Sequence, residues 1–90
     1  MKKTVITVVG KDSVGIIAKV CTYLANNNVN ILDISQTIVQ GFFNMMMIAD
    51  TNEASKDFTA LSEELEQIGQ EMNCIIKLQH EEIFNKMHRI

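Results

Sequence analysis

The sequence predicts a single α+β domain with the element order β-α-β-β-α-β. In four short segments, apolar residues run uninterrupted or alternate, which is typical of strands. In two longer segments they recur at three- and four-residue spacing, which is typical of helices. The chain has 90 residues, of which 47% are hydrophobic and 21% charged. It is therefore long enough for one core and too apolar to be disordered.

The N-terminal part predicts a strand followed by a helix. The β-branched run at residues 4–9 is typical of a central strand that is buried on both faces. Residues 10–15 break the strand pattern, helical spacing begins at Val14, and we expect Asp12 or Ser13 to cap the helix. Asn residues 26–28 end it, because Asn tolerates the left-handed C-cap conformation. The residues expected to face the core are Val14, Ile17, Ala18, Cys21, Leu24 and Ala25.

Residues 29–40 and 42–51 predict a hairpin that turns at Gly41. The first strand alternates, with Leu32, Ile34 and Ile38 on one face and Asp33, Ser35 and Thr37 on the other. The second strand is apolar on both faces, with Phe43, Met45, Met47 and Ala49 opposite Phe42, Met46 and Ile48.

The C-terminal part predicts a second helix, a last strand and a tail. We expect Ser55 to cap the helix, whose apolar stripe is Phe58, Leu61, Leu65, Ile68 and Met72. Residues 73–80 read as a strand. In the tail, residues 81–90, Ile83, Met87 and Ile90 lie at helical spacing.

This order predicts the ferredoxin-like plan, a four-stranded antiparallel sheet of order 4-1-3-2 with two helices on one face. We assign residues 1–80 to this domain and residues 81–90 to a short helical tail that packs on the domain or on a dimer partner. The other sheet face would carry Phe42, Met46 and Ile48, an apolar patch that a small monomer does not normally expose. We therefore expect a homodimer, with the tail contributing to the cover.

Composition excludes several classes of function. A net charge of −3 and a pI near 5.2 disfavour binding to nucleic-acid backbones. The segment from Gln40 to Met47 lacks the basic and aromatic residues of RNA-binding sheets of this topology. No apolar run reaches the roughly 18 residues of a membrane span, and no signal peptide is recognisable, so we expect a cytoplasmic protein.

Metal, redox and catalytic chemistry find little support. His80 and His88 are too far apart on a helix to share an ion, and we expect no metal and no cofactor. Cys21 and Cys74 lie in apolar surroundings and read as small buried hydrophobic residues rather than as a redox pair. Lys11, Asp12 and Ser13 are adjacent, but no His lies near them in the sequence, so we expect no enzyme activity.

The segment from Gly10 to Gly15 is the strongest candidate site. It joins the end of a central strand to the start of a helix, where unpaired N–H groups and the helix dipole favour an anion. The alternative is a turn in which Asp12 and Ser13 only cap the helix. Asn30, at the start of the next strand, can donate to and accept from a polar ligand, or can simply end a turn.

The motif VGKDxxGIxAxVxxxLA, from Val9 to Ala25, followed by NVNIxDIxQ, from Asn28 to Gln36, resembles the ACT domain. ACT domains are small ferredoxin-like modules that bind amino acids and control metabolic enzymes or transcription. The resemblance covers residues 4–80. Within the family, the sequence is most similar in type to the glycine-cleavage-system regulator and to the N-terminal module of formyltetrahydrofolate deformylase. The tail resembles that of a group of bacterial single-ACT-domain proteins.

The resemblance implies a dimer whose ligand lies between the subunits. The family's ligand loop maps onto Asp12, Ser13, Val14 and Gly15, with Lys11 beside it, and an Asn from the partner maps onto Asn30. Many relatives carry Pro just before the glycine, where this chain has Val14, so this loop lacks the fixed φ of Pro.

We therefore expect a regulatory module that binds an amino acid or a similar small metabolite and passes the signal to a partner enzyme or regulator. The alternative is a ligand-free module for protein–protein interaction or dimerisation, which would use the open sheet face or the strand edge at residues 29–40.

Overall fold

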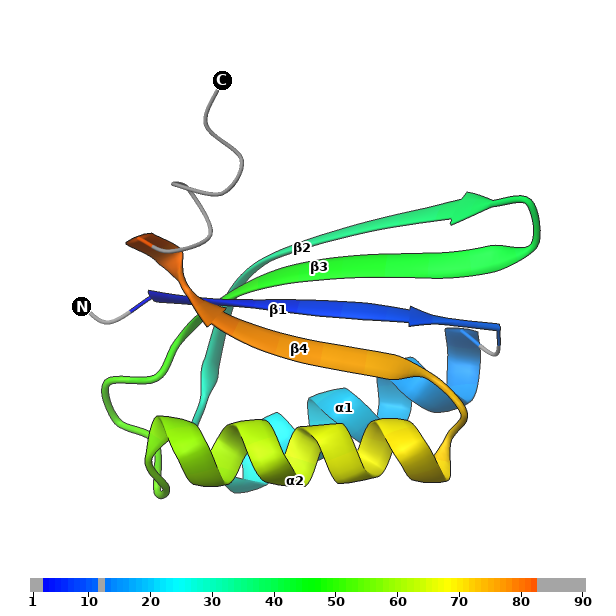
Figure 1. Cartoon of the computed structure of the whole chain (residues 1–90). Coiled ribbons are helices and arrows are strands. Elements are labelled where there is room, and N and C mark those ends of the chain that lie inside the picture. The colour runs from blue at the N-terminus through cyan, green and yellow to red at the C-terminus, as the bar shows by residue number, and fades with distance from the viewer. Residues whose placement is uncertain (1–2, 12, 83–90) are drawn as a thin grey trace.

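The computed structural model describes residues 3–11 and 13–82. The expected order of elements is confirmed (Figure 1), with bounds that differ from the expectation by one or two residues. The elements are β1 (Lys3–Gly10), α1 (Ser13–Asn26), β2 (Asn30–Val39), β3 (Phe42–Asp50), α2 (Phe58–Glu71) and β4 (Ile75–His80).

The strands form one antiparallel sheet of order β2-β3-β1-β4, and both helices lie on the same face of it (Figure 1). This is the predicted ferredoxin-like fold. β1 is central: Thr7 pairs with Met46 of β3 on one side and with Lys77 of β4 on the other. β2 and β4 are the edges, so each has one row of backbone groups without a strand neighbour within the described chain.

The core lies between the sheet and the helices. β3 divides as predicted, because Phe43, Met45, Met47 and Ala49 are buried while Phe42 and Met46 are exposed on the open face. The predicted stripe of α1 is wrong in part. Leu24 is buried as predicted, but the other buried residues are Ile16 and Val20, which the stripe did not include, and Val14 is 78% exposed. The predicted stripe contains two alanines and a cysteine, and burying Ile and Val removes more apolar surface from water.

The ends of the helices rest on specific residues. Asn28 has φ 59° after α1, as expected for an Asn that ends a helix. The expected cap of α2 is wrong: Asp57, not Ser55, is the N-cap, and its Oδ1 accepts from the Ala60 N–H at 2.8 Å. Asn28 Nδ2 lies 3.0 Å from Ser55 Oγ, which ties the end of α1 to the segment before α2.

The β2–β3 hairpin turns at Gln40 and Gly41, whose φ values of 51° and 81° match a two-residue type I′ turn. The hairpin rises away from the helices toward its tip (Figure 1). Consequently Ile38, which pairs with buried Phe43 on the helix side, is still 72% exposed. A register shift between Ile31 and Asp33 adds a bulge to this edge strand.

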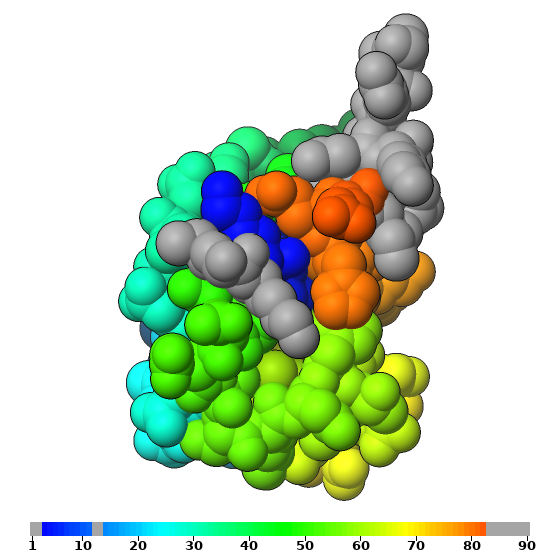
Figure 2. All heavy atoms as spheres, turned by 90° about the vertical axis from the view of Figure 1, so that its left-hand side faces the viewer, coloured from blue at the N-terminus to red at the C-terminus, as the bar shows by residue number. Residues whose placement is uncertain are grey.

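Both termini of the described chain lie at the opposite end of the sheet. There the start of β1, in blue, lies beside the end of β4, in orange (Figure 2). The His80 ring stacks on Phe58, with centroids 4.2 Å apart, so the end of β4 holds the start of α2. The prediction that the tail packs on the domain or on a partner concerns residues 81–90, of which 83–90 lie outside the described residues.

Candidate functional site

The predicted loop begins where three elements come together. Gly10 ends β1 and is buried. A Cβ on Gly10 would lie 2.6 Å from Cys74 Cβ and 2.7 Å from Ile16 Cδ1. Only glycine therefore lets the end of β1 approach the start of β4 and the first turns of α1 this closely.

Beside this junction the surface is hollowed. The hollow has a volume of about 620 Å³, and we call it the end hollow. It is lined by Val9, Gly10 and Lys11 at the end of β1, by Phe42 at the start of β3, and by residues 72–75 at the turn between α2 and β4. Its size falls in the range of about 300–1,000 Å³ that is usual for small-molecule sites.

The lining is apolar apart from one cation and one amide. Val9, Phe42 and Ile75 are exposed within it, and Met72 is half-buried. Lys11 Nζ lies 5.7 Å from the centroid of the Phe42 ring, a cation–π distance. The described residues contain one ion pair, Lys56–Glu64, so no described carboxylate neutralises Lys11. The end hollow can therefore accept an anion next to an apolar surface.

Of the predicted ligand residues that the structure describes, Lys11 alone lines the end hollow. Lys11 lies in the end hollow, Gly15 is half-buried in the first turn of α1, and Ser13 begins that helix. The Val14 side chain points into solvent, and Asp12 lies outside the described residues.

Asn30 lies at the other end of the sheet, because it pairs with Asp50, which pairs with Lys3 at the start of β1. Seven residue steps along β1 separate this row from Gly10, which corresponds to about 23 Å. Asn30 and the loop therefore cannot contact the same small ligand within one chain.

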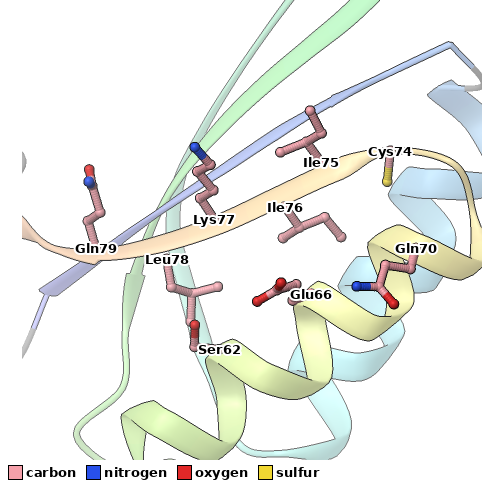
Figure 3. A pocket seen from close by; sticks show the side chains of 9 residues that line it. All are labelled: Ser62, Glu66, Gln70, Cys74, Ile75, Ile76, Lys77, Leu78 and Gln79. Atoms are coloured by element: carbon pink, nitrogen blue, oxygen red, sulfur yellow. The ribbon is translucent and has the colours of Figure 1, made fainter.

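A second hollow, of about 360 Å³, lies between α2 and β4, and we call it the edge groove (Figure 3). Ser62, Glu66 and Gln70 of α2 face the apolar floor made by Ile76 and Leu78. Lys77 and Gln79 point away from the helix (Figure 3). The groove therefore has a polar helix rim and no converging charged groups, and it lacks the residues that the sequence selected. The end hollow is the better candidate.

The two cysteines are free and half-buried, so they are less buried than expected. Cys74 lies between the two hollows and lines both. Desolvation by burial raises the pKa of the Cys74 thiol, which keeps it protonated and unreactive. Its role is packing against Gly10 rather than chemistry.

The main electrostatic cluster of the described chain lies away from the end hollow. Tyr23 Oη donates to Glu64 Oε1 at 2.7 Å, and Lys56 Nζ contacts both oxygens of the same carboxylate, at 2.7 and 2.9 Å. Burial, and then the Glu64 hydrogen bond, raise the pKa of Tyr23. The Lys56 and Tyr23 hydrogen bonds lower the pKa of Glu64. This cluster joins α1 to α2 and serves stability.

Sequence reasoning missed Phe42 and residues 72–75 of the end hollow. They lie about thirty and sixty positions along the chain from Gly10, and only the strand register brings them together. The signal that could have found Phe42 was present: it is the first residue of a strand that is apolar on both faces. No group of three or more His, Cys, Asp or Glu residues within the described ranges could hold a metal ion. Within the same ranges, no helix is long and apolar enough to cross a membrane.

The ferredoxin-like order of strands and helices is the fold of a class of small regulatory domains, and comparison assigns this chain to that class. A family model described as the ACT domain matches residues 2–79, so the chain belongs to the ACT domain family. ACT domains are regulatory modules that bind small molecules. Within the family the chain groups with UPF0237 proteins: one from Bifidobacterium longum is 61% identical over 90 residues, which is 100% of each chain.

Solved structures agree with this assignment. An ACT domain protein from Streptococcus pneumoniae is 44% identical and superposes with a TM-score of 0.81, covering 92% of this chain and 93% of that one. A protein with a provisional assignment as a glycine cleavage system transcriptional repressor is 25% identical, with a TM-score of 0.72. The match covers 88% of this chain but 45% of that one.

Proposed function

We propose that this protein is a cytoplasmic homodimeric regulatory module that binds an amino acid or a similar small metabolite at the end hollow. The ligand's carboxylate contacts Lys11 and the backbone N–H groups of Ser13, Val14 and Gly15. Asp12 orients the amine, and Asn30 of the partner subunit completes the site. The observation that carries the proposal is an apolar hollow containing Lys11, which no described carboxylate neutralises.

The exposed β2 edge supports the dimer. β2 has no strand neighbour on its outer side, and Ile34 and Ile38 are exposed on its helix-facing side. Two β2 strands that pair antiparallel about Ser35 set the start of each strand beside the end of the other. Asn30 of the partner subunit then lies close to the row of Val39 and Phe42, about two strand spacings from the Phe42 side chain.

We propose that the regulatory output passes through a second protein, an enzyme or a transcriptional regulator. The exposed apolar residues of the open face, among them Val9, Phe42 and Met46, are a surface on which such a partner can dock. The expectation that the tail or a second copy covers this face stays a prediction.

The test is a thermal-shift screen of the purified protein against the twenty amino acids and common one-carbon and nucleotide metabolites. Ligand at a hundredfold excess over Kd stabilises the native state by about 2.7 kcal/mol. For a domain of this size, we expect the unfolding midpoint to rise by about 10 °C or more. A flat screen would contradict ligand binding.

Variants locate the site. Lys11→Met and Asn30→Ala should each reduce the shift given by any hit, and Gly15→Ala should reduce it by crowding the loop. Lys19→Met and Asn52→Ala change the same residue types at exposed positions away from the end hollow and should leave the shift unchanged. Ile38→Lys should convert the dimer to a monomer in sedimentation and weaken binding at the same time.

The alternative function, a ligand-free interaction module, is favoured by one observation, the exposed apolar face. If this alternative is correct, no metabolite should shift the unfolding midpoint, and a pull-down should recover one stoichiometric partner at every metabolite concentration. The ligand-binding proposal expects recovery of that partner to change with the metabolite.

A further inference from the structure

We infer that the end hollow selects a monocarboxylate that carries a branched or aromatic apolar chain. This inference rests on the proposed function, since it names the ligand class of the same site. Three features support it: the charge of the lining, the arrangement of its apolar side chains, and the position of Lys11 over the Phe42 ring.

The charge of the lining allows one negative group. Lys11 is the cationic side chain of the end hollow, and no acidic side chain lies among its lining residues in the described chain. One carboxylate can pair with Lys11. A second carboxylate, as in glutamate, would find no second cation among the described lining residues, and against Val9 or Ile75 it would lose part of its hydration.

The apolar side chains form a continuous floor. Val9 and Ile75 are paired neighbours on β1 and β4, and they lie on the open face of the sheet. Val9, Phe42 and Ile75 are 37%, 46% and 60% exposed, although all three are large and apolar. A branched or aromatic chain would cover this surface, whereas the methyl group of alanine would leave most of it in water. Each methylene that becomes buried should tighten Kd by about fourfold.

The position of Lys11 places the charge contact beside the apolar contact. Its ammonium group lies 5.7 Å from the Phe42 ring centroid, so an anion on Lys11 is already beside the ring. A ligand with its carboxylate on Lys11 can therefore lay its chain against Phe42 without a change in the backbone. The contacts with Lys11 and Phe42 do not involve an α-ammonium group, so a 2-oxo acid of the same shape can make both, and a preference for the amino acid would reflect the role proposed for Asp12.

The experiment is calorimetric titration of the full chain with leucine, phenylalanine and their 2-oxo acids, and with alanine, serine and glutamate, at one ionic strength. We expect at least one branched or aromatic ligand to bind ten times or more tightly than alanine, and glutamate not to bind. The amino acid and oxo-acid arms show which chemical form is preferred, and either preference supports the inference.

Variants separate the chain contact from the charge contact. Ile75→Ser should weaken the best apolar ligand about tenfold and reduce its advantage over alanine, whereas Lys11→Met should weaken all carboxylates together. Ile75 is 60% exposed, so its replacement should leave the circular dichroism spectrum unchanged. Ala25→Ser, a change to the same residue type at an exposed apolar position of α1 outside the end hollow and outside β2, should alter neither property.

Two outcomes overturn the inference while the proposed function stands. One is a serine or glutamate Kd below those of the apolar ligands, or a nucleotide or one-carbon hit in the wider screen. The other is an Ile75→Ser variant that keeps the full preference for the apolar chain over alanine. If no small molecule binds in either experiment, the proposed function fails, and this inference fails with it.

Discussion

Replacing Gly10 with alanine should destabilise the domain through two identified close contacts. The new Cβ would lie 2.6 Å from Cys74 Cβ and 2.7 Å from Ile16 Cδ1, closer than real Cβ atoms approach their neighbours. Overpacking of this kind typically costs about 1–3 kcal/mol. Alanine also restricts the unfolded chain, which offsets about 0.4–1 kcal/mol. We therefore expect Gly10→Ala to lower the free energy of unfolding by about 1–2 kcal/mol.

Urea denaturation followed by far-UV circular dichroism measures this change, because the chain has no Trp to report by fluorescence. The midpoint should fall by about 1 M with an unchanged slope. In thermal unfolding, each kcal/mol corresponds to roughly 4–8 °C for a domain of this size. Protein concentration must stay fixed across variants, because association shifts the apparent stability.

A double-mutant cycle identifies the clash as the cause. Cys74→Gly removes the atom that the new Cβ would meet, so Gly10→Ala should cost less in that background. Cys74→Ser keeps the Cβ and should give no such relief. The reasoning would be refuted if the free energy of unfolding of Gly10→Ala were within about 0.5 kcal/mol of the wild-type value, which is the usual range for a neutral surface change. It would also be refuted if Cys74→Ser reduced the cost of Gly10→Ala as much as Cys74→Gly does.

Three further changes test the rest of the fold. Gly41→Ala puts a Cβ on a residue with φ +81° and open space around it, so strain alone should cost about 1 kcal/mol in urea denaturation. Asp57→Ala removes the acceptor of the Ala60 N–H and should lower the free energy of unfolding by about 1 kcal/mol in the same assay. Asp57→Asn keeps an acceptor oxygen and should retain most of that stability. Lys56 and Tyr23 lower the pKa of Glu64 in the folded state, so its contribution is full above the unfolded pKa and is lost as the pH falls through the folded value. Glu64→Gln should therefore narrow the stability difference between neutral and acidic pH, and an unchanged difference would contradict this pairing.

The fold could be predicted because each local pattern agrees with it. The switch from the β-branched run 4–9 to helical spacing, and the Gln40–Gly41 turn between two strand patterns, determine the order of elements. The errors have local causes. α1 is apolar around much of its circumference, so spacing alone did not choose between the Ile16 and Val14 stripes. Ser55 and Asp57 are both good caps two residues apart.

The candidate site could be predicted only in part. Gly10 and Lys11 were found because a strand end followed by a helix start is visible in the sequence. Phe42 and Cys74 meet them through register, which depends on tertiary structure. Asn30 was named correctly as the start of a strand, but its distance from the loop within one chain appears only when the rows of the sheet are counted.

Because Asn30 and Lys11 lie at opposite ends of one sheet, each chain of the proposed homodimer would supply halves of two different sites. In a two-fold dimer, Lys11→Met and Asn30→Ala would therefore damage both sites of each homodimer. When equal amounts of the two variants exchange subunits at random, about half of the dimers contain one chain of each kind. Every such dimer has one site with both wild-type residues, so about a quarter of all sites should bind ligand again. Two inactive variants would then restore function by mixing, as proteins with shared sites do.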